Sequence, residues 1–322
     1  MRETPFLYAV LFVMGIGWGL TVPLAKIAVS TGHQPMGLIF WQLVVVVVFL
    51  GGITLIRGRR LVLGRQYLLL FLMVALCGAV LPDIFFYLAA SRLPGGVMSI
   101  VVSSVAMFSL PIALLMGNER FEPRRLFGVF VGMMGIVLLI GPENSLPGGT
   151  SAGFVLLALC APALYATEGN LVMKWGTQGL DSMQVIFGAS LLGMVISAPI
   201  AVASGQWIDP MDGFGIPEAA LVLGAVIHAA VYACHVWLVG RAGSVFTAQT
   251  SYVVTGCGVI WSMFLLNESY SIWVWLALGV MMLGMFLVQP RSARVLVPGR
   301  VIEEADAGAG AERLHNQERT PR

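Results

Sequence analysis

Ten long apolar stretches, separated by short polar segments, run through the chain. They occupy residues 7–29, 35–56, 67–90, 95–116, 124–141, 151–173, 182–203, 217–239, 245–266 and 271–289. A helix needs about 20 apolar residues to cross the hydrocarbon core of a bilayer, and each stretch is close to or above that length. Turn-forming segments such as Pro94-Gly95-Gly96 separate them. Because the polar and apolar alternation of a transmembrane β-barrel is absent, the pattern predicts an all-α, polytopic membrane protein with ten transmembrane helices.

The composition supports a membrane protein. Hydrophobic residues make up 58% of the 322 positions and charged residues only 11%, and the mean hydropathy is +0.89. A soluble domain has about a quarter of its residues charged, so a soluble enzyme, a nucleic-acid binder and a disordered protein are all disfavoured. Residues 291–322 hold 11 of the 34 charges. This mixed-charge segment without apolar periodicity predicts a solvated, mostly disordered tail.

The basic residues are distributed unevenly between the two sides of the predicted spans. If the N-terminus is cytoplasmic, 16 of the 18 Lys and Arg residues fall in cytoplasmic segments, only Arg92 lies outside, and Lys26 lies within the first span. Cytoplasmic loops carry an excess of basic residues. We therefore expect a multi-pass protein of the cell (inner) membrane with both termini and the tail cytoplasmic.

The two halves of the chain align weakly with each other. A shift of 149 residues places Arg92 on Arg241, Asn118-Glu119 on Asn267-Glu268 and Gly135 on Gly284, and a shift of 148 places Lys26 on Lys174. These anchors predict two five-helix units, residues 1–142 and 150–290. An odd number of helices gives the units opposite orientations, as in alternating-access transporters. A chance alignment of two blocks of similar hydropathy stays open as the alternative.

A set of residues, in order along the chain, resembles the drug/metabolite transporter superfamily, specifically its ten-helix EamA-type members. The set is Trp18-Gly19, Lys26, Pro35, Pro111, Glu119, Lys174, Glu268 and Gly284. The resemblance covers about residues 5–290 and implies a transporter of metabolites or drugs, usually an exporter. It also implies a central cavity lined by helices 1, 3, 4, 6, 8 and 9. Three positions depart from the pattern: Gln42 stands where Arg is common, Ala166 replaces Trp, and Ile260 sits opposite Pro111.

Ionisable residues within the spans are few. Each costs about 2.5–3.5 kcal/mol or more to insert, so such residues usually face a cavity or a partner. Asp83 follows Pro82, which can kink the helix, and shares a face with Tyr87. It is a candidate for substrate or proton binding. The alternative is a fixed hydrogen bond or ion pair with a neighbouring helix, for which Lys26 is a candidate partner.

The sixth span carries Glu168 on roughly the same face as Tyr165. A carboxyl group held away from water suits a proton carrier. The alternative is a structural pair with Lys174 or with a histidine.

The eighth span carries His228, Tyr232 and His235 on one stripe, and the 149-residue shift places Tyr232 opposite Asp83. We expect this stripe to line the cavity. Hydrogen bonding between helices is the alternative, and a metal site is disfavoured because two histidines alone are too few ligands and no HExxH motif is present.

Hydroxyl- and amide-bearing residues concentrate in two spans that the repeat relates to each other. Gln249 and Tyr252 open the ninth span, and Ser103 holds a comparable place in the fourth. They favour a polar pathway, although such residues often only join helices. Glu119 and Glu268, at helix junctions, are interpreted as caps near helix N-termini, with a gating role as the alternative. Gly128, Gly132 and Gly135 are expected to allow close packing within the fold.

These features predict a secondary transporter that works by alternating access. No nucleotide-binding P-loop is present, so ATP-driven transport by this chain alone is disfavoured, and we expect no cofactor, no metal and no enzymatic activity. Trp18 and the tyrosines beside a few ionisable groups suit a small amphipathic substrate such as an amino acid, most simply as an exported one. The alternatives are a multidrug or nucleotide-sugar carrier and, in another class, a lipid scramblase or membrane-embedded enzyme. Expected partners are the substrate, the bilayer and protons as a candidate coupling ion, with no nucleic acid, in a monomer or weak homodimer.

Overall fold

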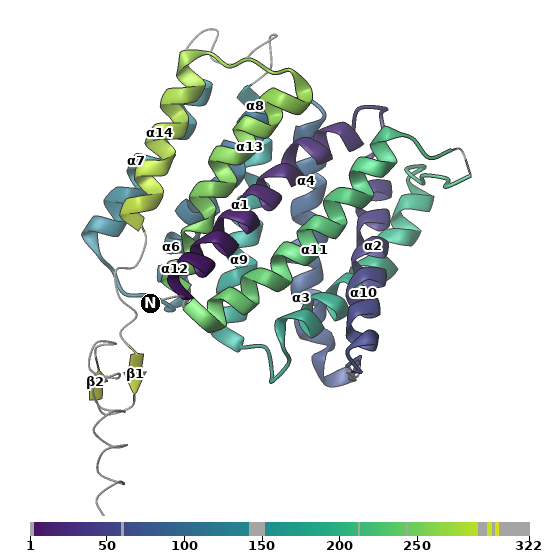
Figure 1. The fold of residues 1–322 in the computed structure, drawn as a ribbon, viewed down its shortest axis with the longest axis horizontal. Helices are drawn as coiled ribbons and strands as arrows, with labels where there is room; N and C mark the ends of the chain where they lie inside the picture. The colour runs from purple at the N-terminus through teal and green to yellow at the C-terminus, as the bar shows by residue number, and fades with distance from the viewer. Residues whose placement is uncertain are drawn as a thin grey trace, which may run out of the picture.

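The computed structural model describes residues 3–58, 61–141, 152–211, 213–242 and 244–288, together with 295–297 and 300–302. The described part of residues 3–288 is a bundle of helices (Figure 1). The first five spans are α1 (Glu3–Ala28), α2 (Pro35–Ile56), a third span made of η1 (Arg65–Tyr67), α3 (Leu68–Ala75), η2 (Leu76–Val80) and α4 (Leu81–Ala90), a fourth made of α5 (Gly95–Ser103) and α6 (Val105–Met116), and α7 (Pro123–Ile140).

The second five spans follow the same order. They are a sixth span made of α8 (Ala152–Ala158) and α9 (Cys160–Trp175), then α10 (Ser182–Ala203), α11 (Ile216–Ala242), a ninth span made of α12 (Ser244–Ala248) and α13 (Thr250–Leu266), and α14 (Ile272–Val288).

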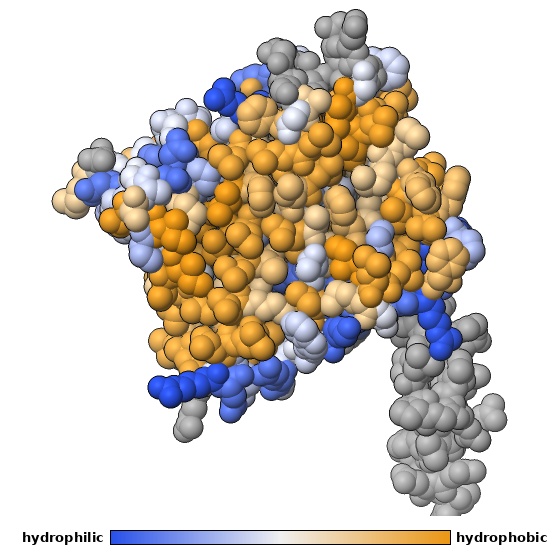
Figure 2. Space-filling view, turned by 180° about the vertical axis from the view of Figure 1, so that it is seen from behind, coloured by the Kyte–Doolittle hydropathy of each residue, from blue (hydrophilic) through white to orange (hydrophobic). Residues whose placement is uncertain are grey.

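Within the described residues, nine helical segments are long and apolar enough to cross a membrane, and α14 is a shorter apolar helix. Figure 2 shows the matching surface: a broad apolar band with polar residues gathered along its two margins. Contact with lipid tails requires such an apolar surface, and the helices beneath it satisfy their backbone groups internally. The predicted all-α, polytopic membrane fold is confirmed, and all ten predicted spans have a helical counterpart.

The third span widens where Pro82 enters it. Pro82 has no N–H to donate to the carbonyl four residues earlier, and the π-turn of η2 lies immediately before it. The wider turn accommodates the proline without ending the helix. The predicted distortion at Pro82 is therefore present, and Asp83 follows it in the first turn of α4.

Helix packing forms a regular pattern. α7 packs along α14, α2 along α10, and α5 against α13. α1 lies between α11 and α13, and α9 lies between α4 and α6. Figure 1 shows the α7–α14 pair at one edge of the bundle and α2 with α10 toward the other. Exchanging each span with the one five places along the chain leaves all of these pairs in place.

The α7–α14 contact depends on glycine. A Cβ atom on Gly284 of α14 would lie 2.4 Å from the Cα of Gly132 and 2.9 Å from the carbonyl oxygen of Gly128, both in α7. These are backbone atoms and cannot move aside as a flexible side chain could. The prediction that the glycines of this span pack within the fold is confirmed.

Two short strands lie in the C-terminal tail. β1 (Val295–Val297) pairs antiparallel with β2 (Arg300–Ile302). These six residues differ from the irregular chain predicted for residues 291–322, and β-branched residues such as Val295 and Val297 have a high strand propensity. The other positions of the predicted tail lie outside the described residues.

Replacing Gly284 with alanine is expected to destabilise the protein by about 1–3 kcal/mol, because the added methyl group overpacks a contact between two backbones. The control is Gly279→Ala on the same helix, where a Cβ has nothing within 4 Å. That change should be neutral or slightly stabilising, because alanine is the better helix former. Thermal unfolding in detergent measures both, and equal midpoints for the two variants would contradict the packing argument.

Candidate functional site

Asp83 is the centre of a hydrogen-bonded network that joins three helices. One carboxylate oxygen accepts a bond of 2.8 Å from Nε2 of Gln42 in α2, and the other accepts a bond of 2.6 Å from the hydroxyl of Tyr165 in α9. Tyr87, one turn along α4, donates to the Gln42 carbonyl oxygen. Asp83 is 7% exposed and Tyr87 3%. The carboxylate is thus buried and has a donor on each oxygen, as a buried polar group requires.

This network corresponds to one of the two sequence interpretations of Asp83. It has fixed hydrogen bonds to neighbouring helices, but the partner is not Lys26, whose ammonium group donates to the carbonyl oxygen of Ala90 at 2.8 Å. Gln42 is a site residue that the sequence interpretation did not select. Its signal is nonetheless present, since Gln42 is the single amide in the apolar stretch 35–56.

Glu168 lies one turn beyond Tyr165 on α9 and differs from Asp83 in its surroundings. Its carboxylate has no hydrogen-bond or ion-pair partner within the described chain. Its Cγ atom lies 3.1 Å from where a Cβ of Gly78 in η2 would be, so the glycine leaves just enough room for it. Across from it, Glu168 interacts electrostatically with Tyr232 of α11. The predicted pairs of Glu168 with Lys174 or histidine do not form, and Lys174 donates to the Met116 carbonyl oxygen at 3.0 Å.

The histidine stripe of α11 meets Trp18 of α1. Nε1 of Trp18 donates to Nδ1 of His228 at 3.2 Å, and the Trp18 ring lies edge-on to both His228 and His235, with centroids 5.7 Å apart in each case. Tyr232 packs against His235 with ring centroids 6.3 Å apart. The Nδ1 atom of His235 is buried without a hydrogen-bond partner in the described structure. The predicted stripe of α11 therefore faces α1, where Trp18 contacts it.

Side chains of α9 and α11 connect the two groups of residues. α9 and α11 are not closely packed on each other among the described residues, yet Glu168 and Tyr232 interact between them. Trp18, Tyr165, Glu168 and Tyr232 are half-buried and His228 is exposed. We call this set, with Asp83 and Gln42, the central cluster.

Lys26 belongs to a different part of the bundle, beyond the central cluster at the end of α1. Glu268, in the loop before α14, accepts bonds from the backbone N–H groups of Gly95 at 2.9 Å and Gly96 at 3.3 Å. Tyr270 donates to the same carboxylate and accepts from Gly96 N–H at 2.9 Å. Lys26 also attracts Glu268 electrostatically. Glu268 thus caps the first turn of α5, as predicted for a helix N-terminus, and ties α5 to the last two spans.

Its repeat counterpart Glu119 makes a different contact. Glu119 accepts a bond of 2.9 Å from Nη1 of Arg125, whose Nε donates to the carbonyl oxygen of Val288 at the end of α14. The predicted cap at Glu119 is replaced by this ion pair.

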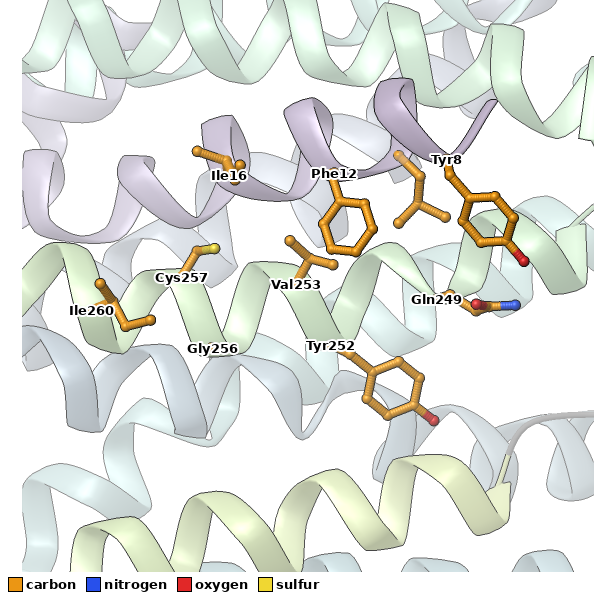
Figure 3. Close-up of a pocket in the computed structure, with 10 residues that line it drawn as sticks. Tyr8, Phe12, Ile16, Gln249, Tyr252, Val253, Gly256, Cys257 and Ile260 are labelled. Carbon is orange, nitrogen blue, oxygen red and sulfur yellow. The ribbon is translucent and has the colours of Figure 1, made fainter. Parts of the chain in front are cut away.

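Three predicted pathway residues lie apart from the central cluster. The hydroxyl of Ser103 donates back to the Ile100 carbonyl oxygen at 2.7 Å within its own helix. Gln249 and Tyr252 line a largely apolar groove of about 480 Å³ between α1 and α13, together with Tyr8, Phe12 and Val253 (Figure 3). The amide of Gln249 and the hydroxyl of Tyr8 lie at the same end of the groove (Figure 3). In the part of the chain that the structure describes, no group of three or more His, Cys, Asp or Glu residues could hold a metal ion.

Comparison with known proteins agrees with this architecture. The sequence model of the EamA-like transporter family matches residues 6–141 and again residues 153–289. The chain is 24% identical over 289 residues to the "Uncharacterized inner membrane transporter YedA" of Escherichia coli (strain K12), covering 89% of this chain and 92% of that protein. An "Uncharacterized transporter" of Archaeoglobus fulgidus is 28% identical over 219 residues, which are 66% of this chain and 72% of that protein.

A solved structure, named only "Crystal structure of protein", has a TM-score of 0.59 and 18% sequence identity. The match covers 86% of this chain and 94% of that chain. At this identity the likeness concerns the fold alone.

Removing the hydroxyl of Tyr165 tests the Asp83 network. We expect Tyr165→Phe to cost about 1–2 kcal/mol of unfolding free energy, above the ~0.6 kcal/mol average for hydrogen bonds between membrane helices, because the acceptor is a buried carboxylate. In an Asp83→Asn background the cost should fall, as a double-mutant cycle measures. Tyr232→Phe is the control, since the Tyr232 hydroxyl has no hydrogen-bond partner in the described chain. Independent, additive effects of the Tyr165 and Asp83 changes would argue against the network.

Proposed function

Because this chain belongs to the EamA-like transporter family, we propose that it is a secondary transporter of small amphipathic metabolites, such as amino acids, that works by alternating access. Export from the cell is the proposed direction. Substrate and direction rest on the chemistry of the central cluster and on the family pattern seen in the sequence. They do not rest on the relatives' names, which specify neither.

The observation that carries the proposal is the position of the central cluster. Gln42, Asp83 and Trp18 belong to the first segment that matches the family, and Glu168 and Tyr232 belong to the second. Polar and ionisable residues within the spans thus gather where the two halves meet. Transporters built from two repeats bind their substrates at this interface, and intramembrane ionisable residues mark substrate or ion pathways.

The helix packing supports an inverted repeat. The same family model matches both halves, and the main packed pairs are preserved when each span is exchanged with the one five places along. Because each half has five spans, the exchange reverses direction across the membrane. Alternating access follows if the two halves can exchange their conformations.

The contacts that break this symmetry indicate one conformational state. α1 packs on α4 and α5, but α9, its counterpart, is not closely packed on α11 or α13 among the described residues. Lys26 bonds the end of α4, whereas Lys174 bonds the end of α6 instead of the end of α11. We therefore propose that the end of the bundle where α1 terminates is closed, and that the central cluster is reached from the other end, where α9 and α11 pack less closely.

We define the latch as Glu268, Tyr270 and the first turn of α5 at Gly95 and Gly96. Burial, reinforced by the Glu268 carboxylate, raises the pKa of Tyr270 above its ordinary value, so the phenol keeps its proton and stays a donor to Glu268. A carboxylate at the first N–H groups of a helix is favoured by about 0.3–1 kcal/mol, and by more where water is excluded. The latch is thus strong enough to hold a closed end and weak enough to open.

We also propose that the protein lies in the inner membrane with both termini cytoplasmic. The bias of the basic residues supports the orientation. A relative is named as an inner membrane transporter. In this orientation the closed end faces outward.

Transport by reconstituted protein tests the function directly. Proteoliposomes should show counterflow of at least one substrate from a panel of radiolabelled amino acids and metabolites, measured with and without an imposed pH gradient. Asp83→Asn and Glu168→Gln should each lower the rate at least about tenfold (about 1.4 kcal/mol). Glu218→Gln is the matched control, since its carboxylate pairs with His33 at 2.6 Å away from the cluster. No counterflow across the whole panel would reject the function, and full activity of both variants would reject the roles of the two carboxylates.

Neutralising the latch should open the closed end. In a chain with its four native cysteines replaced, Gly169→Cys introduces a reporter thiol beside Glu168 at an exposed position with nothing within 4 Å of its Cβ. Labelling by a membrane-impermeant maleimide from the outer side should rise several-fold when Glu268→Gln is added. Asp209→Asn is the control, because among the described residues the Asp209 carboxylate accepts a bond from the Met211 N–H within its own loop. An unchanged labelling pattern would mean that the latch does not gate access.

A further inference from the structure

Resting on the transport function proposed above, we propose that the central cluster selects a protonated amine. The favoured substrate is an organic cation with an apolar or aromatic body, taken in preference to a zwitterion, with Glu168 as the contact for the ammonium group.

The charged side chains of the central cluster are acidic. It contains two carboxyl side chains, Asp83 and Glu168, and within the described residues no lysine or arginine is paired with either. The two lysines of the spans are engaged elsewhere, Lys26 with Ala90 at one end of the bundle and Lys174 with Met116 at the other. An anionic group entering the cluster would meet carboxylates without a compensating cation, and this arrangement discriminates by repulsion as well as by attraction.

The histidine of the cluster does not supply the missing positive charge. Nδ1 of His228 accepts the Trp18 N–H, so that nitrogen carries a lone pair and the ring is neutral. His235 has a buried Nδ1 without a partner in the described structure, and its ring contacts Trp18 and Tyr232. Neither ring forms an ion pair with Asp83 or Glu168 in the described structure.

The two carboxyl groups differ in their hydrogen-bond partners. Asp83 has a donor on each oxygen and holds α2, α4 and α9 together, so its lone pairs are largely occupied. Glu168 has no partner in the described chain and is held against Gly78. A carboxylate out of bulk water without a partner is costly. The free carboxyl is therefore the group that an incoming ammonium would stabilise most.

Aromatic rings complete the recognition of a cation. Tyr165 lies one turn before Glu168 on α9, Tyr232 lies across from it on α11, and Trp18 reaches the same stripe from α1. The faces of such rings attract an organic cation and bind its apolar body at the same time. An amino acid would use the same ammonium contact, but its carboxylate would have no cationic partner in the cluster.

Three probes that share one aromatic body separate the possibilities: phenethylamine as the cation, phenylalanine as the zwitterion and 3-phenylpropionate as the anion. Calorimetry on the purified full chain in nanodiscs should give the tightest binding for phenethylamine and at least tenfold weaker binding for 3-phenylpropionate. The isosteric change Glu168→Gln should weaken phenethylamine at least tenfold. Glu218→Gln, a carboxyl group paired with His33 away from the cluster, should leave its binding unchanged.

A second test adds a positive charge beside Asp83. Gln42→Arg puts a guanidinium where the amide now bonds the carboxylate, and it should narrow or reverse the preference for phenethylamine over phenylalanine. The proposal is overturned if the anion binds as tightly as the cation, if Glu168→Gln has no effect, or if none of the three probes binds the folded wild-type chain. The last result would leave the transport function standing wherever the counterflow panel finds another substrate.

Discussion

The cost of placing a polar group in hydrocarbon governs this molecule. Inserting a charged side chain at the centre of a bilayer costs at least about 2.5–3.5 kcal/mol. An unbonded backbone group there costs several kcal/mol. The chain meets the backbone requirement with helices throughout the described bundle. It meets the side-chain requirement by bonding its intramembrane groups to other helices, as Asp83 bonds Gln42 and Tyr165, and Lys26 bonds Ala90. Glu168 and the buried Nδ1 of His235 are among the exceptions in the described residues, and function is expected at exceptions to so strong a constraint.

Tight and loose packing divide the bundle into a fixed part and a part that can move. Gly132 and Gly284 bring the backbones of α7 and α14 so close that no Cβ fits between them, and bistable rearrangement is not expected in such a contact. Toward the centre, α9 and α11 are not closely packed on each other among the described residues, and Glu168 and Tyr232 interact electrostatically between them. Glu168 therefore lies beside a looser contact than Asp83 does, and a ligand bound there as we propose would bias the arrangement of the helices around it.

The fold could be predicted from the sequence in most respects, because the hydrophobic requirement acts on runs of residues. Ten apolar stretches, the distortion at Pro82 and the close packing of the glycines follow from runs and local chemistry, and the structure contains all three. Pairings of single side chains could not be predicted in the same way, since they depend on how each helix is rotated and how deeply it sits. Lys26 was a plausible partner for Asp83 by depth, but it bonds a helix end instead. Gln249 and Tyr252 have the composition of a cavity lining, and they line a separate apolar groove.

Residues that the proposed repeat relates can have different partners, which the sequence alone does not predict. Lys26 and Lys174, and likewise Glu268 and Glu119, occupy matching places in the two halves and yet have different partners. The two glutamates differ because the residues around them differ: the 149-residue shift places Arg125 on Val274 and Phe121 on Tyr270. The two lysines instead both bond backbone carbonyl oxygens, which either half offers. In the inverted repeat that we propose, the two lysines therefore show two alternative helix-end contacts, one in each half. Under the alternating-access mechanism that we propose, exchanging these lysine contacts would need no new type of interaction, so they would add little to the energy difference that a substrate must overcome.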